Sequence, residues 1–339
     1  LEEQGGFRED RGCSDQRWIL NEIIQSRREK RKKTYLLFVD FTKAYDLVWR
    51  ESILYHLDRM GIRGKCWRVI RDMYREVRSS VKVNGRVSEK WASEVGTRQG
   101  SVLSPILFSL AVNGIIERLR AKGYGVRMGE ELVPGLLFAD DLVIMADSEE
   151  ELRLAIEEVE QWVREWRFIV NNKKCGVMVV AESSKKAREI KRKWMLCGEE
   201  VKEVESYKYL GIEQQKRKGW SEYINRVVKH GSRVVGQMKM IGVHQHGLRP
   251  TTGRRLAQSL LFPILEYGND VLVLNKHQQQ QIEAVVMRAA KVICGMSEHA
   301  TVMSDAVRGE LGWHTMAERN EVAKLKYFHR LRTLPNTRL

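Results

Sequence analysis

The sequence of 339 residues lacks the features that define small secreted, zinc-binding or membrane-spanning proteins. Its five cysteines are widely scattered, with no Cys-x-x-Cys pair and no histidine at the spacing of a zinc ligand. No apolar run approaches the ~18–20 residues that cross a bilayer, and no charged-then-apolar segment opens the chain. We therefore expect a soluble protein with reduced thiols inside a cell and no membrane partner.

Positive charge is what the chain has in excess. Lys and Arg number 59 against 44 Asp and Glu, which gives a formal net charge of +15 and a pI near 9.6. Such a balance is typical of proteins that neutralise phosphates, although it does not separate a nucleic acid from an anionic membrane. The chain begins at Leu1 rather than Met and soon enters a Gly-Gly-Phe-Arg segment at 5–8. We therefore expect it to be a fragment of a longer protein.

The periodicity of apolar residues predicts an α+β fold built on an antiparallel sheet over residues 1–211, followed by a helical region over 212–339. Trp162 and Trp166 fall on the apolar stripe of one predicted helix and are expected to be core rather than base-stacking residues. The predicted helices cover 14–33, with Ser14 or Asp15 as its cap, 47–60, 65–78, 104–123, 148–167, 220–241, 251–274 with a kink at Pro263, and 278–293. The predicted strands cover 35–40, 136–146, 177–181 and 201–209, and Asn84-Gly85 turns a further hairpin.

Two of these apolar strands end in aspartate, the first at Asp40 and the second at Asp140-Asp141. Carboxylates at the ends of buried strands are costly to desolvate unless they are paired, hydrogen-bonded or bound to a cation. Magnesium prefers such oxygens, and two ions about 3.5–4 Å apart can clamp the attacking and leaving oxygens of a phosphoryl transfer. An Asp-Asp pair is also common at ordinary hairpin turns, so that interpretation stays open for the pair taken alone.

The segment between the two acidic strands, residues 96–105, reads GTRQGSVLSP. Its glycines, its arginine and the start of the following helix offer backbone amides and a cation to a flat or anionic ligand. Taken with the acidic strands, this segment resembles motif B of the reverse transcriptase family. The resemblance is narrower still to the polymerases of non-LTR (LINE-type) retrotransposons, because several motifs follow in that family's order over nearly the whole chain.

The resemblance implies a catalytic role for four residues. Asp40 matches the metal-binding aspartate of motif A, and Asp140 and Asp141 match motif C in its LINE-type form. Together they would bind two Mg²⁺ ions, with Mn²⁺ as an alternative. Lys174 lies in a segment, 171–175, that resembles motif D, where a lysine acts near the leaving pyrophosphate. A cation or proton donor is apt there because it stabilises charge developing on that oxygen.

The resemblance also implies contacts with substrates. Tyr45 matches the steric gate that rejects a ribose 2′-hydroxyl, and the predicted nucleotide-binding set is Phe41, Tyr45, Arg98, Gln99 and Gly100. The predicted template and primer contacts lie in a fingers segment at 4–8 and a primer-grip hairpin at 207–211, and they are Phe7, Arg8, Tyr207, Tyr209, Leu210 and Gly211. Taken singly, Tyr45, Lys174, Tyr207 and Tyr209 have ordinary interpretations as core or surface residues.

On this resemblance the chain is expected to be a right-hand polymerase that copies an RNA template from a DNA primer with dNTPs. Residues 1–211 would hold partial fingers and the palm, and 212–339 a helical thumb and post-thumb region. A longer parent protein would carry an endonuclease domain, and target-primed insertion would bring the protein into the nucleus as well as the cytoplasm. Two alternatives stay open: a group II intron maturase-like reverse transcriptase, and a catalytically inactive RNA-binding remnant.

Overall fold

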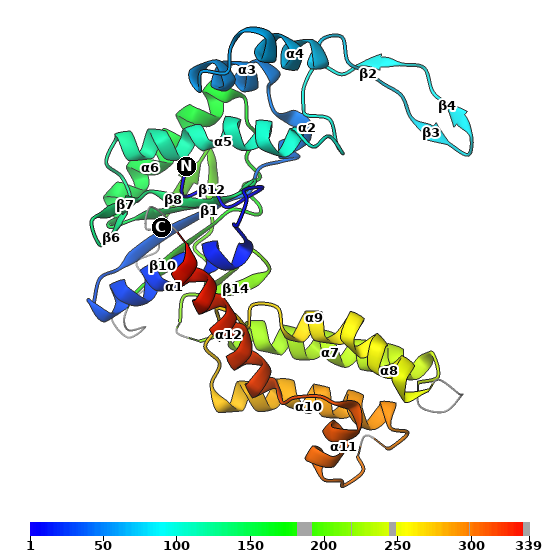
Figure 1. Ribbon diagram of the computed structural model, residues 1–339. Helices are drawn as coiled ribbons and strands as arrows, with labels where there is room; N and C mark the ends of the chain where they lie inside the picture. The colour runs from blue at the N-terminus through cyan, green and yellow to red at the C-terminus, as the bar shows by residue number, and fades with distance from the viewer. Residues whose placement is uncertain (182–191, 218, 244–248, 298, 335–339) are drawn as a thin grey trace. The chain divides into compact units, whose positions relative to one another are not determined.

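The computed structural model describes residues 1–181, 192–217, 219–243, 249–297 and 299–334 (Figure 1). The chain divides into two compact units, Leu1–Leu210 and Gly211–Arg338. Within the described residues no helix combines the length and apolar character needed to cross a membrane.

The first unit is built around a four-stranded antiparallel sheet with the strand order β10-β1-β9-β8. Its strands are β1 (Thr34–Val39), β8 (Gly135–Phe138), β9 (Asp141–Ala146) and β10 (Gly176–Val180). Alternate residues of β1 enter two different cores, with Leu36 and Phe38 in one and Leu37 and Val39 in the other. Both faces of the sheet are therefore covered, which explains why its strands read as continuous apolar runs.

Helices supply the second layer on each face. Helix α1 (Cys13–Glu29) shares one core with Leu36 and Phe38. Helices α5 (Ser104–Ala121) and α6 (Glu149–Trp166) share the other core. The remaining elements of this unit are α2 (Ala44–Leu47), α3 (Arg50–Arg59), α4 (Gly64–Tyr74), β2 (Arg78–Ser79), β3 (Lys82–Val83), β4 (Arg86–Val87), β5 (Trp91–Ala92), β6 (Val126–Met128), β7 (Glu131–Val133), β11 (Trp194–Leu196), β12 (Glu199–Val201) and β13 (Ser206–Tyr209).

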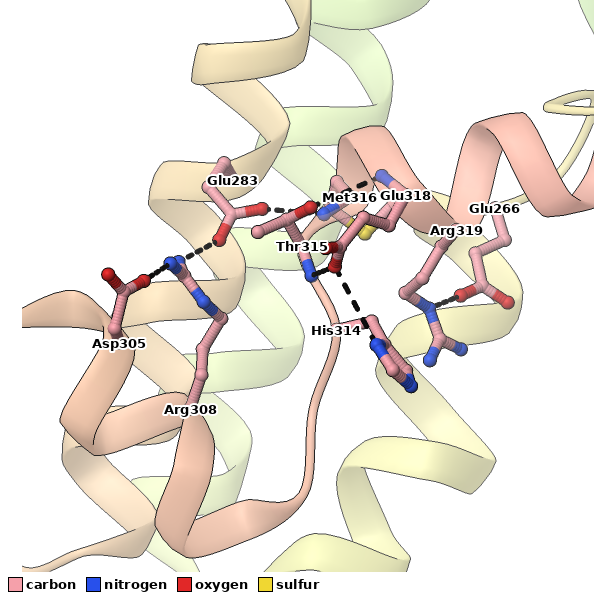
Figure 2. A network of polar contacts seen from close by, with 9 residues as sticks. All are labelled: Glu266, Glu283, Asp305, Arg308, His314, Thr315, Met316, Glu318 and Arg319. Carbon is pink, nitrogen blue, oxygen red and sulfur yellow. Dashed lines mark hydrogen bonds and ion pairs between the residues drawn. The ribbon is translucent and has the colours of Figure 1, made fainter.

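The second unit is mainly helical. It comprises β14 (Ile212–Gln215), α7 (Ser221–Met240), α8 (Pro250–Leu256), the π-helix η1 (Ala257–Leu261), α9 (Phe262–Leu265), α10 (Lys276–Ile293), α11 (Ser304–Leu311) and α12 (Met316–Thr333). Figure 2 shows a polar network that ties α10, α11 and α12 together. The carboxylate of Glu283 accepts hydrogen bonds from the Arg308 guanidinium at 2.7 Å and from the Met316 backbone N–H at 2.8 Å. Through these two bonds the largely buried Glu283 carboxylate of α10 holds α11 and α12.

The α+β class and the antiparallel sheet are confirmed. The predicted helix at 148–167 is α6, whose cap Ser148 accepts a hydrogen bond from the Glu151 N–H at 3.0 Å, and Trp162 is buried as predicted. The Asn84-Gly85 turn joins β3 to β4, also as predicted. These successes rest on local signals: a cap, an apolar stripe and a turn dipeptide.

Several predicted boundaries are wrong. Residues 201–209 form the end of β12 and a separate strand, β13, rather than one strand. The helix predicted over 251–274 ends at Leu265, and the π-helix η1 directly precedes α9, whose second residue, Pro263, has no backbone N–H to donate. Helix α1 is capped at Gly12, whose N–H donates to the Asp15 carboxylate at 2.8 Å. Helices α11 and α12 were not predicted.

Candidate active site

A tight turn between β8 and β9 carries the aspartate pair. Phe138 pairs with Asp141 across the hairpin, and Ala139 at its apex has a φ of +57°, in the left-handed region that disfavours residues with a Cβ. The β1–β9 register pairs Val39 with Leu142, so the next residues, Asp40 and Asp141, lie at the same end of the sheet. The register therefore places Asp40, Asp140 and Asp141 at the same edge of the sheet.

The loop that precedes β10, residues 171–175, holds Asp40. The Asp40 carbonyl accepts a hydrogen bond from the Asn171 N–H at 2.8 Å, and the Asp40 N–H donates to the Cys175 Sγ at 3.4 Å. The same loop turns tightly, because the Lys174 N–H donates to the Asn171 carbonyl at 2.9 Å. This turn brings the Lys174 Nζ to 3.7 Å from Asp40 Oδ2. The predicted motif A and motif D residues are thus in contact.

Burial and neighbouring charges raise the pKa of both aspartates of the turn, Asp140 and Asp141. Desolvation raises the pKa of Asp141 to about 6 even though part of its side chain reaches solvent, and the charges of Asp140 and Asp40 add to that rise. The pKa of Asp140 is also raised, chiefly by burial, with the Asp40 charge raising it and the Lys174 charge opposing the rise. Negative charge on Asp140 and Asp141 is therefore disfavoured without a counter-ion.

The donor set fits a hard divalent cation, because such ions take carboxylate oxygens and would relieve this mutual repulsion. Over the described ranges, no group of three or more His, Cys, Asp or Glu side chains is gathered closely enough to hold a metal ion. Asp40, Asp140 and Asp141 carry the type of oxygen that magnesium prefers, but their side chains do not form a coordination shell in the described residues.

Tyr45 lies beside this cluster. Its ring stacks on Phe108 with centroids 4.2 Å apart, and the exposed ring of Phe7 meets it edge-on at 6.4 Å. Burial raises the pKa of the Tyr45 phenol, and the nearby Asp140 charge raises it further. Its hydroxyl is buried without a hydrogen-bond partner in the described part of the chain. Tyr45 is thus a packed, protonated phenol whose O–H donates no hydrogen bond within the described residues.

The loop at residues 96–100 is tied to the segment that follows Asp40. Gly96 has a φ of +82° and lies so close to the Asp46 carbonyl that a Cβ would collide with it. The Thr97 N–H donates to the Tyr45 carbonyl at 2.8 Å, and the Gln99 side-chain amide donates to the Asp46 carboxylate at 2.8 Å. These contacts fasten the loop to the turn that carries Tyr45. Arg98 and Gly100, by contrast, are exposed and face solvent from the same loop.

Two predicted residues of the first unit make contacts within the chain, and their binding to substrates stays a prediction. The Phe41 ring is buried in the core, 5.3 Å from the Phe168 ring, so it offers no free face to a nucleotide. The Arg8 guanidinium is engaged by the N-terminal segment, where it donates to the Gln4 carbonyl at 3.3 Å and to the Glu2 carboxylate at 3.1 Å. Both residues shape the surroundings of the site through packing and backbone contacts.

The predicted primer-grip residues divide between the two units. Tyr207 is half-buried and stacks on Phe38, with centroids 4.2 Å apart, whereas Tyr209 is buried with a relative exposure of 4%. Leu210 is buried and ends the first unit. Gly211 begins the second unit, and a Cβ there would lie 2.8 Å from the Tyr267 ring. A direct contact of any of these with a primer stays a prediction.

Several residues that fix the site were missed by the sequence reasoning. Gln4 contacts the aspartate hairpin, Asp46 holds Gln99, and the Arg50 guanidinium donates to the carbonyls of Gly96 and Val95 at 2.9 and 3.0 Å. Only their position could have identified them, because each lies within or beside a predicted motif. Nothing in their residue type separates them from ordinary polar surface residues.

An arm formed by the pairs β2–β5 and β3–β4 extends from the first unit (Figure 1). Its residues 80–92 are all exposed, including the Trp91 ring. Four cations lie along it at four-residue spacing, and none forms an ion pair with any residue that the structure describes: Arg78, Lys82, Arg86 and Lys90. We call this segment, residues 78–92, the basic arm.

Comparisons with known proteins agree with this geometry. A family model described as reverse transcriptase (RNA-dependent DNA polymerase) matches residues 1–214. The chain belongs to this family of polymerases.

Its relatives identify the branch of the family. The Pol polyprotein of the R2 retrotransposable element of Nasonia vitripennis is 28% identical over 208 residues, which cover 59% of this chain and 20% of that protein. The RNA-directed DNA polymerase from the mobile element jockey of Drosophila melanogaster is 23% identical over 341 residues, covering 98% of this chain and 36% of that protein. The chain is therefore related to non-LTR retrotransposon polymerases and spans a minor part of the length of these relatives.

One solved structure, that of telomerase from Candida albicans in complex with a fragment of telomeric RNA, matches with a TM-score of 0.49 and 10% identity. The match covers 93% of this chain and 56% of that one.

Proposed function

We propose that this chain is the catalytic core of an RNA-directed DNA polymerase that copies an RNA template into DNA by two-metal nucleotidyl transfer. The observation that carries the proposal is the placement of Asp40, Asp140 and Asp141 at one sheet edge, where burial and the charges of neighbouring carboxylates raise the pKa of Asp140 and Asp141. A bound cation would offset the cost of placing these carboxylates together, whereas an ordinary turn does not require such carboxylates.

The three aspartates would hold the two Mg²⁺ ions, or Mn²⁺ in their place. Bound there, the ions would lower the pKa of the primer 3′-hydroxyl and neutralise charge on the triphosphate. Lys174, held 3.7 Å from Asp40, is placed to stabilise charge on the leaving pyrophosphate. These roles follow from the chemistry of the residues and from membership of the family.

Tyr45 would select the sugar. Because its ring stacks on the buried Phe108, with Phe7 at its edge, it would present a fixed barrier to a ribose 2′-hydroxyl. Arg98 and Gln99 lie on the loop tied to the same turn, so nucleotide and template would be read beside the gate. The carbonyl of Tyr45 and the carboxylate of Asp46 thus position the binding loop.

The template and primer would be the macromolecular partners. Phe7 beside Tyr45 and the unpaired cations of the basic arm offer stacking and phosphate contacts. A duplex-bound polymerase that acts in target-primed insertion would work in the nucleus after synthesis in the cytoplasm. An endonuclease would come from a longer parent protein, as the length of the relatives allows.

The test is primer extension on poly(A)·oligo(dT) with dTTP, with Mg²⁺ present or replaced by EDTA. We expect incorporation that depends on the metal and that exceeds incorporation on a poly(dA) template. Salt-sensitive duplex binding without any incorporation would contradict the proposal and favour a catalytically inactive RNA-binding remnant. Extension accompanied by promotion of intron splicing would favour the maturase-like alternative.

A further inference from the structure

We infer that Gln4 is a positioning residue that holds the turn between β8 and β9, and thereby the aspartate pair, in its working conformation. The inference rests on the proposed function, because the importance of this turn depends on Asp140 and Asp141 acting as metal ligands. Gln4 is itself buried, with a relative exposure of 1%.

The N-terminal segment lies along β8 as a fifth, parallel partner. Gln4 and Leu137 form a parallel bridge, in which the Leu137 N–H donates to the Glu3 carbonyl at 2.9 Å and the Gly5 N–H donates to the Leu137 carbonyl at 2.8 Å. The backbone of residues 3–5 is therefore fixed beside the last residues before the turn. This places the Gln4 side chain at the turn itself.

One oxygen of Gln4 joins both segments. Its Oε1 accepts a hydrogen bond from the Ala139 N–H at 3.0 Å and another from the Gly6 N–H at 2.8 Å. The side-chain nitrogen faces Asn113 Oδ1 at 3.5 Å, which agrees with the oxygen pointing toward the turn. Gln4 thus accepts a hydrogen bond from the backbone N–H of Ala139, which would otherwise be buried without a partner.

The local geometry requires this contact. Ala139 has a φ of +57°, a conformation that an alanine adopts only when its surroundings hold it there. A Cβ at Gly6 would collide with the Ala139 backbone, so the segment approaches as closely as glycine allows. The turn residue bound by Gln4 is the immediate neighbour of Asp140. Loss of the acceptor is therefore expected to release the carboxylate that follows.

The chain offers a matched control. Gln16 is also a buried glutamine that braces the same N-terminal segment, since its side-chain amide donates to the Glu3 carbonyl at 3.1 Å. It is hydrogen-bonded to this segment and not to the aspartate turn. Gln16→Leu therefore removes a buried amide of equal size without removing the contact to Ala139.

The experiment compares Gln4→Leu with Gln16→Leu in two measurements. Amide hydrogen exchange in metal-free protein reports the turn without requiring activity, and single-nucleotide extension reports kcat and KM. We expect Gln4→Leu to speed exchange at Ala139 at least tenfold and to lower kcat at least tenfold, with KM for dTTP and duplex Kd within twofold. Gln16→Leu should change neither exchange at Ala139 nor kcat by more than about twofold.

A second substitution separates positioning from general damage. Glycine accepts a positive φ without strain, so Ala139→Gly in the Gln4→Leu background should restore part of kcat. If Gln4→Leu does not fold, Gln4→Asn serves in its place, because it keeps the amide but withdraws the acceptor from the turn.

Unchanged exchange at Ala139 in the Gln4 variant overturns the inference, and so does an equal effect of Gln16→Leu. Faster exchange with an unchanged kcat also overturns the inference but leaves the proposed function intact. Failure of the parent chain to extend a primer overturns the proposed function and, with it, the positioning role, while exchange at Ala139 still shows whether Gln4 holds the turn.

Discussion

Two groups of carboxylates, one in each unit, are used in opposite ways. In the second unit, Glu283 accepts from Arg308 and from the Met316 backbone, and hydrogen bonds from Thr315 lower the pKa of Glu318 (Figure 2). At the sheet edge of the first unit, burial and like charges raise the pKa of Asp140 and Asp141 instead. The first arrangement stabilises a fold, whereas the second stores repulsion that a bound cation would relieve.

This difference is what the proposed function predicts, because the sheet edge would hold metal ions. A carboxylate that holds structure is surrounded by donors, and its removal should weaken folding. A carboxylate that binds a metal is surrounded by other carboxylates, and its removal should lower catalytic activity. Neutralising one carboxylate of each kind tests whether their roles differ.

The largest effect is expected at Asp40. Asp40→Asn should lower RNA-templated extension by at least about 1,000-fold, because it removes a predicted ligand of the catalytic ions. Stability of the metal-free protein to urea should not fall, because a repulsive charge is lost. Asp58→Asn neutralises an exposed aspartate of the same unit that pairs with Arg63 at 2.7 Å, and it should alter neither property. Equal losses of activity in the two variants would contradict the assignment.

The next largest effect concerns folding of the second unit. Glu283→Gln should lower the free energy of unfolding by about 1–3 kcal/mol, because it takes a charged acceptor from the largely buried Arg308. Glu310→Gln, at an exposed position of α11, is the control and should have little effect. Extension per folded molecule should stay within about twofold of the parent. A loss of kcat without a loss of stability would contradict the purely structural role of Glu283.

A smaller effect should follow pH. The folded-state pKa of Asp141 is about 6 against an ordinary value of 3.8, so the native state binds more protons than the unfolded state between these values. Stability of the metal-free protein should therefore fall as pH rises through about 4 to 6. Urea titrations in EDTA should show this contribution in the parent and lose it in Asp141→Asn. A variant with the same pH profile as the parent would show that the carboxylate is not destabilised by its neighbours.

The smallest effect is expected at the basic arm. Lys82→Ala/Arg86→Ala/Lys90→Ala should reduce the salt dependence of binding to single-stranded RNA by about 2 in the slope of log K against log[salt]. Lys30→Ala/Lys32→Ala/Lys33→Ala removes the same charge from the exposed end of α1 and is the control. Equal slopes for the two triple variants would mean that the arm adds only net charge.

The sequence predicted the strands, helix and turns around the candidate site because their signals are local. Two apolar strands ending in aspartate, a helix capped by Ser148 and a turn at Asn84-Gly85 each depend on neighbouring residues. Sheet register then brings Asp40 to Asp141 without any further information. For this reason the class of fold and the carboxylate cluster could be proposed from one chain.

What could not be predicted depends on long-range contacts and side-chain direction. The bond from Ala139 to Gln4 spans 135 residues, and no residue type announces it. Motif matching gave no sign that the Phe41 and Tyr209 rings point into cores. Helix α12 was missed because it has no continuous apolar stripe: its buried residues are few, while Leu325 and Phe328 are exposed.

The central claim is that the carboxylates at the sheet edge perform metal-dependent nucleotide addition. The most direct test is single-turnover addition of dTTP to a pre-bound poly(A)·oligo(dT) duplex across a Mg²⁺ titration, with Asp140→Ala beside the parent chain. The account predicts saturable addition by the parent, no measurable addition by the variant, and equal duplex affinity and stability for both. Addition by Asp140→Ala at the parent rate would contradict it.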